Sequence, residues 1–332
     1  MQLLRKIVFP ISLVYALVVF LRNYFFDIGI LKERSYPTKT ICVGNLSVGG
    51  TGKTPMVEYL ISTLAKNHKV AVLSRGYKRR SGGFILANSS HTVEDLGDEP
   101  FQIASKFPDI TVAVDSDRRN GIEQLELKTQ PDFIVLDDAF QHRRVKPELT
   151  ILLTAYNDLY INDWYLPTGN LRDGIRQAKR ADLIIVTKCP DDLEFRESEN
   201  IVVDLKIGKH QQVLFSCINY SDVIFGSDGS KDMGELIGES ITLVTGIANA
   251  KHLVGHLKKK RINFDHLEYR DHHFFTDSEI ALFSSKGMIL TTEKDYVRLK
   301  SRLDNLYYLP IRQEFLFDGD KIMKKRIAEF TN

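Results

Sequence analysis

The chain of 332 residues is long enough for two domains of ordinary size, and its 43% hydrophobic and 27% charged residues are typical of a globular protein with a core. The 45 basic and 43 acidic side chains nearly cancel, to a formal net charge of +2, so no overall basic character points to nucleic acid. Cys42, Cys189 and Cys217 lie far apart, which excludes the spacing of a zinc site or a disulfide framework and fits a reducing cytoplasm.

The first expected element is an apolar helix near the N-terminus. Residues 7–21 carry no charged side chain and are bracketed by basic residues. The run is shorter than the about 20 apolar residues of a transmembrane helix, and it lacks the cleavage pattern of a signal peptide. We therefore expect residues 1–34 to form a membrane-associated helical segment in the lipid interface, with a helix buried against the protein as the alternative. The aromatic residues expected near the headgroups are Tyr15, Tyr24, Phe25 and Phe26.

A phosphate-binding loop follows at Ser47–Pro55, between an apolar run at 40–43 and a helical pattern that continues to Lys66. Its glycines let backbone N–H groups turn toward phosphate oxygens, Lys53 can reach the outer phosphates, and the Thr54 hydroxyl can bind Mg²⁺. The usual motif begins with glycine where this chain has serine, so a plain glycine-rich turn is the alternative. The residues expected to bind nucleotide here are Gly49, Gly50, Thr51, Gly52, Lys53 and Thr54.

Polar residues follow the next strand and open the next helix. The strand 69–74 runs into a basic turn, 75–80, which is either a solvated loop or a contact for phosphate. Asp98 lies where a helix through Phe107 is expected to begin. Taken alone, this carboxylate is expected to cap the helix.

Two adjacent carboxylates, Asp137 and Asp138, end the apolar strand that begins at Phe133. Neighbouring residues on a strand point to opposite faces, so the two acids are expected to have different roles. Acids in this position opposite a phosphate loop can organise Mg²⁺, although a strand end can also be merely solvated. Other polar candidates expected at this edge of the sheet are Arg118, Gln141 and His142.

The pattern predicts an α/β fold. Further β-type runs at 149–155 and 182–188 are separated by an expected helix that ends at Lys179. Strands alternating with helices predict a P-loop NTPase-like, doubly wound and mostly parallel sheet. The sequence at Thr187–Asp191 resembles the guanine-reading signature of GTPases but lacks its asparagine, so guanine specificity is not supported.

A second, smaller α/β domain is expected after the strand 212–218. The polar, glycine-rich stretch 219–239 is expected to be a passage between domains. The domains predicted are 1–34 for the membrane-associated segment, 35–211 for the P-loop domain and 212–332 for the smaller domain. The expected elements beyond the passage are strands at 241–245, 262–269, 288–290 and 305–311, and helices at 250–257 and from Ser278.

The loop before the helix from Ser278 carries a histidine pair. Thr276 and Glu279 have the spacing of a capping box, which places His272 and His273 just before the helix. Such a pair is either structural or catalytic. The residues alone thus predict an ATP- or GTP-using protein with Mg²⁺. A kinase for a membrane-borne acceptor, a P-loop switch or metallochaperone acting on a protein partner, and a membrane-attached scaffold all remain open.

Taken together, the motifs identify a family. They are Gly44-Asn45, Gly49–Pro55, Ser74–Tyr77, Gly97–Pro100, Asp137–His142, Leu171-Arg172, Asp271–Phe274 and Thr292–Asp295. In this set, from the N-terminal helix to nearly residue 300, the chain closely resembles tetraacyldisaccharide 4′-kinases of the lipid A pathway. The resemblance implies transfer of the ATP γ-phosphate to the 4′-hydroxyl of tetraacyldisaccharide 1-phosphate, an acylated glucosamine disaccharide, to give lipid IVA. It also implies the cytoplasmic face of the bacterial inner membrane, with no nucleic acid and no obligate protein partner.

The resemblance also implies roles for individual residues. Asp98 becomes the candidate general base, assisted by His272, while Asp137 and Asp138 organise metal and phosphate. Asp173 stands where the family more often has glutamate. The residues implied around the nucleotide phosphates or the acceptor are Arg118, Gln141, His142 and Arg172, with Asp173 beside them.

Overall fold

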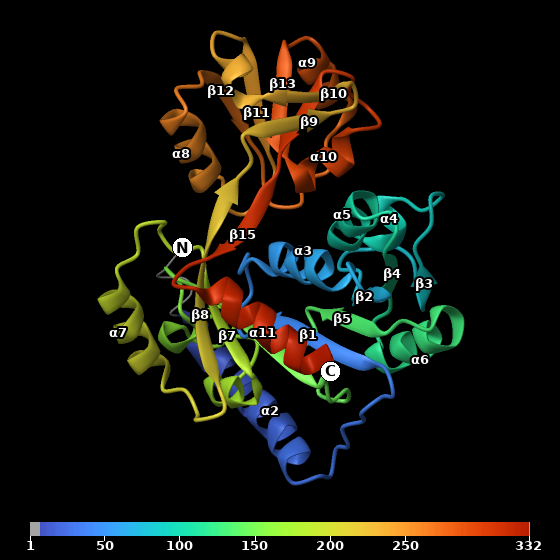
Figure 1. Ribbon diagram of the computed structural model, residues 1–332, viewed down its shortest axis with the longest axis vertical. Helices are drawn as coiled ribbons and strands as arrows, with labels where there is room; N and C mark the ends of the chain where they lie inside the picture. Colours follow the sequence, from blue (N-terminus) through green and yellow to red (C-terminus); the bar gives the residue numbers. More distant parts are fainter. Residues whose placement is uncertain (1–6, 332) are drawn as a thin grey trace.

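A computed structural model describes residues 7–331, which form two α/β units stacked along the long axis of the molecule (Figure 1). The larger unit is built on a nine-stranded sheet and the smaller on a six-stranded sheet. Apolar cores cover both faces of each sheet. The α/β class and the mostly parallel, P-loop-type sheet predicted from the sequence are confirmed.

The larger sheet is parallel from β8 to β4 and has one antiparallel strand at each edge. Its central strands are buried throughout, as expected for a parallel sheet covered by helices on both faces. In sheet order the strands are β15 (Ile311–Phe315), β8 (Gln212–Tyr220), β7 (Leu183–Thr187), β6 (Leu149–Ala155), β1 (Lys39–Asn45), β5 (Phe133–Asp137), β2 (Val70–Ser74), β4 (Thr111–Val114) and β3 (Ile85–Leu86).

The helices of the larger unit follow the strands with short connections. Apolar residues at helical spacing bury α3 against the central strands, which fixes the helix that follows the phosphate loop. The segment expected as a helix before Lys179 is a 3₁₀ helix. The elements are α2 (Phe9–Asp27), α3 (Lys53–Leu64), α4 (Val93–Leu96), α5 (Asp98–Lys106), α6 (Arg118–Thr129), α7 (Phe195–Leu205), α11 (Gly319–Thr331), η1 (Tyr160–Asn162) and η2 (Ile175–Arg180).

The smaller unit contains a hairpin that the sequence did not reveal. Residues 219–239, expected to be a passage, include β9 and β10, which pair antiparallel and extend the sheet beside β14. Its elements are β10 (Gly229–Asp232), β9 (Val223–Gly226), β14 (Leu306–Leu309), β13 (Met288–Thr292), β11 (Ile241–Thr245), β12 (Phe264–Glu268), η3 (Met233–Leu236), α8 (Lys251–Lys259), α9 (Asp277–Ser284) and α10 (Glu293–Leu299).

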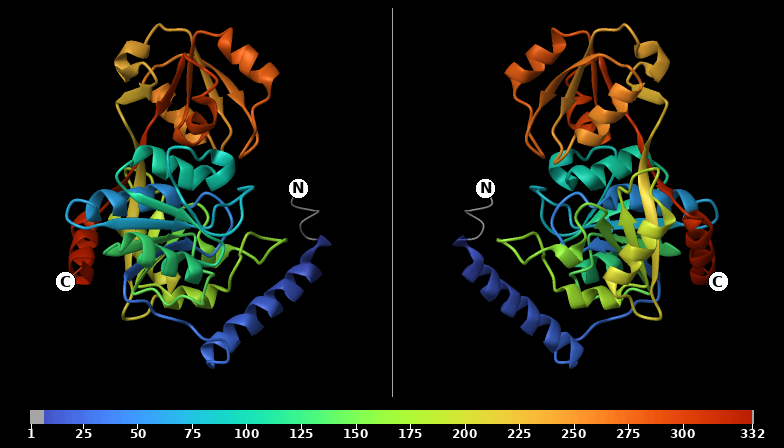
Figure 2. Two further views of the ribbon diagram at one scale, coloured as in Figure 1. Left: turned by 90° about the vertical axis from the view of Figure 1, so that its right-hand side faces the viewer. Right: turned by 90° about the vertical axis from the view of Figure 1, so that its left-hand side faces the viewer.

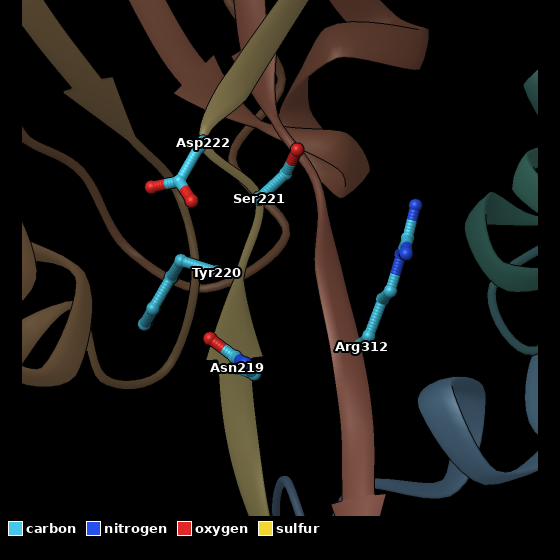
Figure 3. A pocket seen from close by; sticks show the side chains of 5 residues that line it. All are labelled: Asn219, Tyr220, Ser221, Asp222 and Arg312. Carbon is cyan, nitrogen blue, oxygen red and sulfur yellow. The ribbon is translucent and has the colours of Figure 1, made fainter. Parts of the chain in front are cut away.

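Two strands of the larger sheet connect the units. The chain leaves through β8 and returns through β15, and β15 pairs antiparallel with β8, from Ile311 opposite Tyr220 to Phe315 opposite Ser216. Figure 3 shows this crossing, where Tyr220 and Arg312 point to opposite sides beside a hollow of about 220 Å³. Because β8, β15 and α11 belong with the larger sheet, we propose domain boundaries at 220/221 and 310/311 instead of the single boundary expected at 211/212.

The helix α2 projects along the side of the larger unit (Figure 2). It is long and apolar enough to cross a membrane by length and composition, and 17% of its apolar window is buried. The buried residues Ser12, Val19 and Asn23 lie on one face, and the Ser12 hydroxyl donates to Thr168 Oγ1 at 2.8 Å. The remaining face is exposed, which contradicts the alternative of a buried helix. The exposed apolar side chains include Ile11, Leu13, Val14, Leu17, Val18 and Phe20.

Candidate active site

The phosphate-binding loop has the geometry that its glycines require. Gly52 has a φ of 83°, in the left-handed region, and stands directly before α3, so the helix N-terminus faces the loop. Two hydrogen bonds hold the loop in place: Val48 N–H donates to the carbonyl of Asn170, in the loop before η2, at 2.7 Å, and Thr187 Oγ1, at the end of β7, donates to the Thr51 carbonyl at 2.8 Å. A plain glycine turn would not need this support. The arrangement presents Lys53 and Thr54 at the start of α3.

Asp138 lies between two cations at the mouth of this loop. Arg172 donates to both oxygens of its carboxylate, at 3.0 and 2.7 Å, and Lys53 Nζ lies 3.5 Å from Oδ1. Burial raises the pKa of Asp138, but the hydrogen bonds from Arg172 and the charge of Lys53 hold it well below its usual range. Arg172 also donates to the side chain of Asn45, at the end of β1. Asp138 therefore fixes the side chains of Lys53 and Arg172, the two cations closest to it, beside the loop.

Asp137 has the opposite environment. It is fully buried at the end of β5, and its Oδ2 accepts a hydrogen bond from Ser74 Oγ at 2.9 Å. Among residues 7–331, its Oδ1 has no hydrogen-bond partner. Burial and the nearby carboxylates of Glu99 and Asp138 raise the pKa of Asp137 to about 7. A buried carboxylate oxygen that lacks a partner fits a position that receives a divalent cation.

The remaining predicted phosphate contacts divide into two groups. Arg172 faces the loop, and Gln141 donates from Nε2 to the Asn45 carbonyl at 2.7 Å beneath it. Arg118 is almost fully buried and donates to the backbone carbonyls of Asp137 and Asp138 at 3.1 and 3.3 Å. Its guanidinium thus fixes the acidic strand end from behind instead of facing the loop.

His142 lies apart from the phosphate loop. Its Nε2 is 3.6 Å from a carboxylate oxygen of Asp117, at the start of α6. Burial and the charge of Arg118 lower the pKa of His142 to about 4, so the ring is neutral at physiological pH. A neutral imidazole here can take part in hydrogen bonds but cannot neutralise phosphate charge.

The predicted base meets the smaller unit. Asp98 is the first residue of α5, after Gly97 at the N-cap, and no side chain caps that helix. The Asp98 carboxylate instead reaches across the interface, with Oδ2 at 2.5 Å from His272 Nδ1 and Oδ1 accepting from Arg298 Nε at 2.7 Å. The structure therefore contradicts the capping role and brings Asp98 and His272 together.

The two histidines differ in their contacts. His272 has a φ of 61°, and its Nε2 lies 3.2 Å from Lys294 Nζ. His273 instead contacts the Glu279 carboxylate at 3.0 Å and stacks on Tyr269. His273 therefore has the structural role that was one of the two alternatives for the pair, whereas His272 lies at the interface between the units.

Comparison with known proteins places this site in a family. A sequence model of the family described as tetraacyldisaccharide-1-P 4′-kinase, LpxK, matches residues 4–331. The chain belongs to this family.

Two relatives and one solved structure agree with this family assignment. The chain is 48% identical to the tetraacyldisaccharide 4′-kinase of Flavobacterium psychrophilum, over 98% of this chain and 97% of the relative. It is 41% identical to the enzyme of the same name from Phocaeicola vulgatus, over 99% and 95%. Its fold matches LpxK from Aquifex aeolicus, solved in complex with ATP, with a TM-score of 0.81, 29% identity and coverage of 99% and 100%.

For a member of the LpxK family, the structure adds residues that sequence reasoning missed. Lys294 and Arg298 reach the Asp98–His272 pair, and Glu99 lies near both Lys294 and Asp137. Lys294 stands inside the motif Thr292–Asp295, so the motif gave a signal for it. Arg298 is 200 positions from Asp98 and lies outside every motif, so only the fold reveals it.

In this LpxK-family chain, Asp173 has a role that the sequence left open. Its carboxylate is fully buried and accepts from Asn23 Nδ2 at 2.6 Å, while Arg22 lies at 3.1 Å. Nearby, the Tyr15 hydroxyl donates to the Arg172 carbonyl at 3.1 Å. Tyr15 therefore faces the protein and not the headgroups, and Asp173 anchors α2 directly beside a residue of the phosphate site.

Proposed function

We propose that this protein transfers the γ-phosphate of ATP to the 4′-hydroxyl of tetraacyldisaccharide 1-phosphate, forming lipid IVA. The observation that carries the proposal is the combination of three features: a phosphate loop with Lys53 and Arg172, an Asp98–His272 pair at the interface between the units, and an apolar helix whose Tyr15 contacts Arg172. A P-loop switch acting on a protein partner needs neither the pair nor the helix. Family membership supports the kinase over that alternative.

The chemistry places little demand on a strong base. The bond from the γ-phosphorus to the bridging oxygen of ADP breaks as the bond to the 4′-oxygen forms, and the hydroxyl proton goes to the Asp98–His272 pair. In a loose transition state the proton leaves late, so positioning and charge neutralisation supply most of the acceleration. A carboxylate whose pKa lies below its usual range, as for Asp98, suffices for this role. In this proposal Lys53 and Arg172 supply more of the rate acceleration than the base does, because they position the phosphates and neutralise their charge.

The residues present fit a magnesium ion. Thr54 and Asp137 would hold it, because the hydroxyl stands at the start of α3 and Oδ1 of Asp137 lacks a partner among residues 7–331. Bound there with the nucleotide, Mg²⁺ would neutralise phosphate charge. Among the described residues, no three histidine, cysteine or acidic side chains are placed to hold a metal ion together. Mg²⁺ at nucleotide sites usually takes only one or two protein ligands and the rest from phosphate and water.

We further propose that the protein works at the cytoplasmic face of the inner membrane as a peripheral or monotopic enzyme. The exposed face of α2 carries apolar side chains over most of its length, whereas its other face is fastened to the larger unit. Such a helix lies in the lipid interface. It would bring an acylated acceptor to Arg172, since its own Tyr15 contacts that residue.

One assay tests the proposal. Purified protein with ATP, Mg²⁺ and tetraacyldisaccharide 1-phosphate in mixed micelles is expected to yield ADP and phosphorylated lipid in equal amounts. ATP without the lipid, and GTP with or without it, serve as controls. Hydrolysis of GTP that ignores the lipid would favour the switch instead, and nucleotide binding without any turnover would favour a scaffold.

A further inference from the structure

The helix α10 directs two cations at the start of α5. Lys294 and Arg298 are four positions apart, so they lie on one face of α10. Asp98 and Glu99 are the first two residues of α5, and Lys294 Nζ lies 3.8 Å from a Glu99 oxygen. Lys294 belongs to the motif Thr292–Asp295, and the proposed reaction gives no residue of this motif a role. The two helices thus join the smaller unit to the residue that carries the proposed base.

The Arg298 side chain is held firmly. It is 5% exposed, and Nε and Nη2 donate to the two oxygens of Asp98, the former at 2.7 Å. Nη1 donates to the His273 carbonyl at 3.3 Å and lies 3.6 Å from Asp295. Asp295 in turn accepts from Gly246 N–H at 2.9 Å. The two parallel hydrogen bonds from the planar guanidinium, here called the fork, fix the orientation of the Asp98 carboxylate, as bidentate arginine pairs do.

We propose that Arg298 is a positioning residue for phosphoryl transfer, which keeps Asp98 ionised and aligned on His272 so that this pair is complete only while α10 is packed on α5. The inference rests on the proposed function, because it gives Arg298 a task in that reaction. Arg298 touches neither nucleotide nor acceptor in this assignment. It acts through Asp98.

The charges around Asp98 support this role. Asp98 itself contacts His272, from the loop after β12, and Arg298, from α10. The charged groups next to these partners are Asp271 and Lys294 beside His272, Asp295 beside Arg298, and Glu99 beside Lys294. Burial raises the pKa of Asp98, but hydrogen bonds from His272 and Arg298 hold it well below its usual range. Without Arg298, burial would remain and only His272 would oppose it. The pKa of Asp98 would then rise.

The ionised carboxylate also sets the tautomer of His272. His272 Nδ1 lies 2.5 Å from Asp98 Oδ2 and 3.0 Å from Arg298 Nη2, and a neutral ring that donates from Nδ1 to the carboxylate keeps its lone pair on Nε2. That nitrogen faces the ammonium group of Lys294 at 3.2 Å. A protonated Asp98 would no longer fix this arrangement, so Arg298 controls both members of the pair.

The test compares three variants. Arg298→Gln removes the charge, Arg298→Lys keeps it without the fork, and Lys300→Gln is the matched control. Lys300 is a cation at the end of the same helix that contacts Ser105 on α5 at 3.4 Å and does not contact Asp98. Each variant is measured for kcat/KM from pH 5 to 9, for ATP affinity and for thermal unfolding.

For Arg298→Gln we expect the acidic limb of the profile to move to higher pH, because the pKa of Asp98 rises, and turnover at pH 7 to fall by up to about 10²-fold. ATP affinity should stay unchanged. Arg298→Lys should shift the limb less, and added guanidinium should partly restore an Arg298→Ala variant. Lys300→Gln should keep the wild-type limb. In an Asp98→Asn background, loss of Arg298 should have little further effect.

Three results would overturn the inference while leaving the kinase assignment intact. They are an acidic limb that does not move, a shift of equal size in Lys300→Gln, and losses from Asp98→Asn and Arg298→Gln that simply multiply. If Arg298→Gln does not fold, Arg298→Lys and its smaller shift decide the matter. A wild-type protein that consumes no ATP with the lipid would instead overturn the proposed function itself.

Discussion

Asp137 and Asp138 are neighbours in sequence with opposite surroundings. Asp138 is paired with Lys53 and Arg172, which keep it ionised, while Asp137 is buried with one oxygen lacking a partner among the described residues. Strand alternation alone predicted that the two acids differ. It could not predict which one is paired, because Arg172 arrives from a loop more than thirty residues later in the chain.

Substitution should separate the two acids. Asp137→Asn is expected to weaken binding of ATP with Mg²⁺ by roughly tenfold or more, since it removes the oxygen that we propose binds the metal, and to leave metal-free ATP binding nearly unchanged. Asp138→Asn removes the partner of Lys53 and Arg172, so it should not weaken binding of ATP with Mg²⁺ selectively. Calorimetric titration of ATP with and without Mg²⁺ measures the difference. Equal losses in both titrations for Asp137→Asn would contradict its role as a ligand.

Asp98 and Lys53 should differ in how much they contribute. We expect Asp98→Ala to lower turnover by roughly 10²–10⁴-fold with the fold intact, and Lys53→Ala to lower it further, because charge neutralisation outweighs proton removal in this reaction. Lipid-dependent ADP release under saturating substrates checks both. Normal turnover by Asp98→Ala would exclude it as the base, and a circular dichroism spectrum confirms folding.

Among the elements, α2 was predictable as a helix and its anchor was not. An uncharged run of this length predicts an apolar helix. The contacts that fasten it, from Ser12 to Thr168 and from Asn23 to Asp173, join positions about 150 apart, and no local pattern encodes them. The anchor decides which face stays exposed, and so which face can meet lipid.

The two faces of α2 should have separable tasks. Replacing Val14, Leu17 and Val18 by serine is expected to reduce binding to anionic vesicles and kcat/KM for the lipid, because these exposed side chains would enter the interface. ATP affinity should not change. The matched variant Asn23→Ala keeps the exposed face and loses the contact with Asp173, so it should bind vesicles normally but turn over slowly. Vesicle co-sedimentation and the kinase assay distinguish them, and unchanged sedimentation of the serine variant would refute the membrane role.

Elements at the edges of the sheets were the hardest to predict. Within the hairpin, β9 is apolar, but β10 is a polar edge strand that faces solvent, so the stretch around it resembles a linker in sequence. The run expected as one strand at 305–311 is split at Pro310 into β14 and β15, which belong to different sheets. Central strands such as β5 carry a continuous apolar signal, which is why the core of the larger sheet was predicted and its borders were not.

At the scale of the molecule, the two units meet at the connector strands and at the face between α5 and α10. The connector is only two strands wide, and such crossings permit hinge motion. What holds the units together besides Arg298 is a cluster in which Lys106 Nζ lies 2.7 Å from both Glu58, on α3, and Glu293, at the start of α10. Gln102 Nε2 also lies near both carboxyls, at 3.1 and 3.4 Å. Lys106 is thus shared between the two buried carboxyl groups of Glu58 and Glu293.

This cluster should make packing of the units depend on pH. Burial and the charge of Glu58 raise the pKa of Glu293 to about 7 from its ordinary 4.5, against the opposing charges of Lys106 and Arg312, with Tyr308 nearby. Separation of the units would hydrate Glu293 and return its pKa toward the ordinary value. Between these two values the packed state holds a proton that the separated state releases, so packing weakens as pH rises through the window and levels off above it.

The expected change is at most about tenfold in the packing equilibrium per pH unit, since one proton is involved. Interdomain distances between one spin label on each unit, recorded from pH 5 to 8, should therefore shift toward separation in the wild type. Glu293→Gln cannot titrate and should give a flatter curve, whereas Glu314→Gln, an exposed glutamate on β15 paired with Asn219, should behave as the wild type. Parallel curves for the wild type and Glu293→Gln would show that the carboxyl pair does not govern how the kinase holds its two units together.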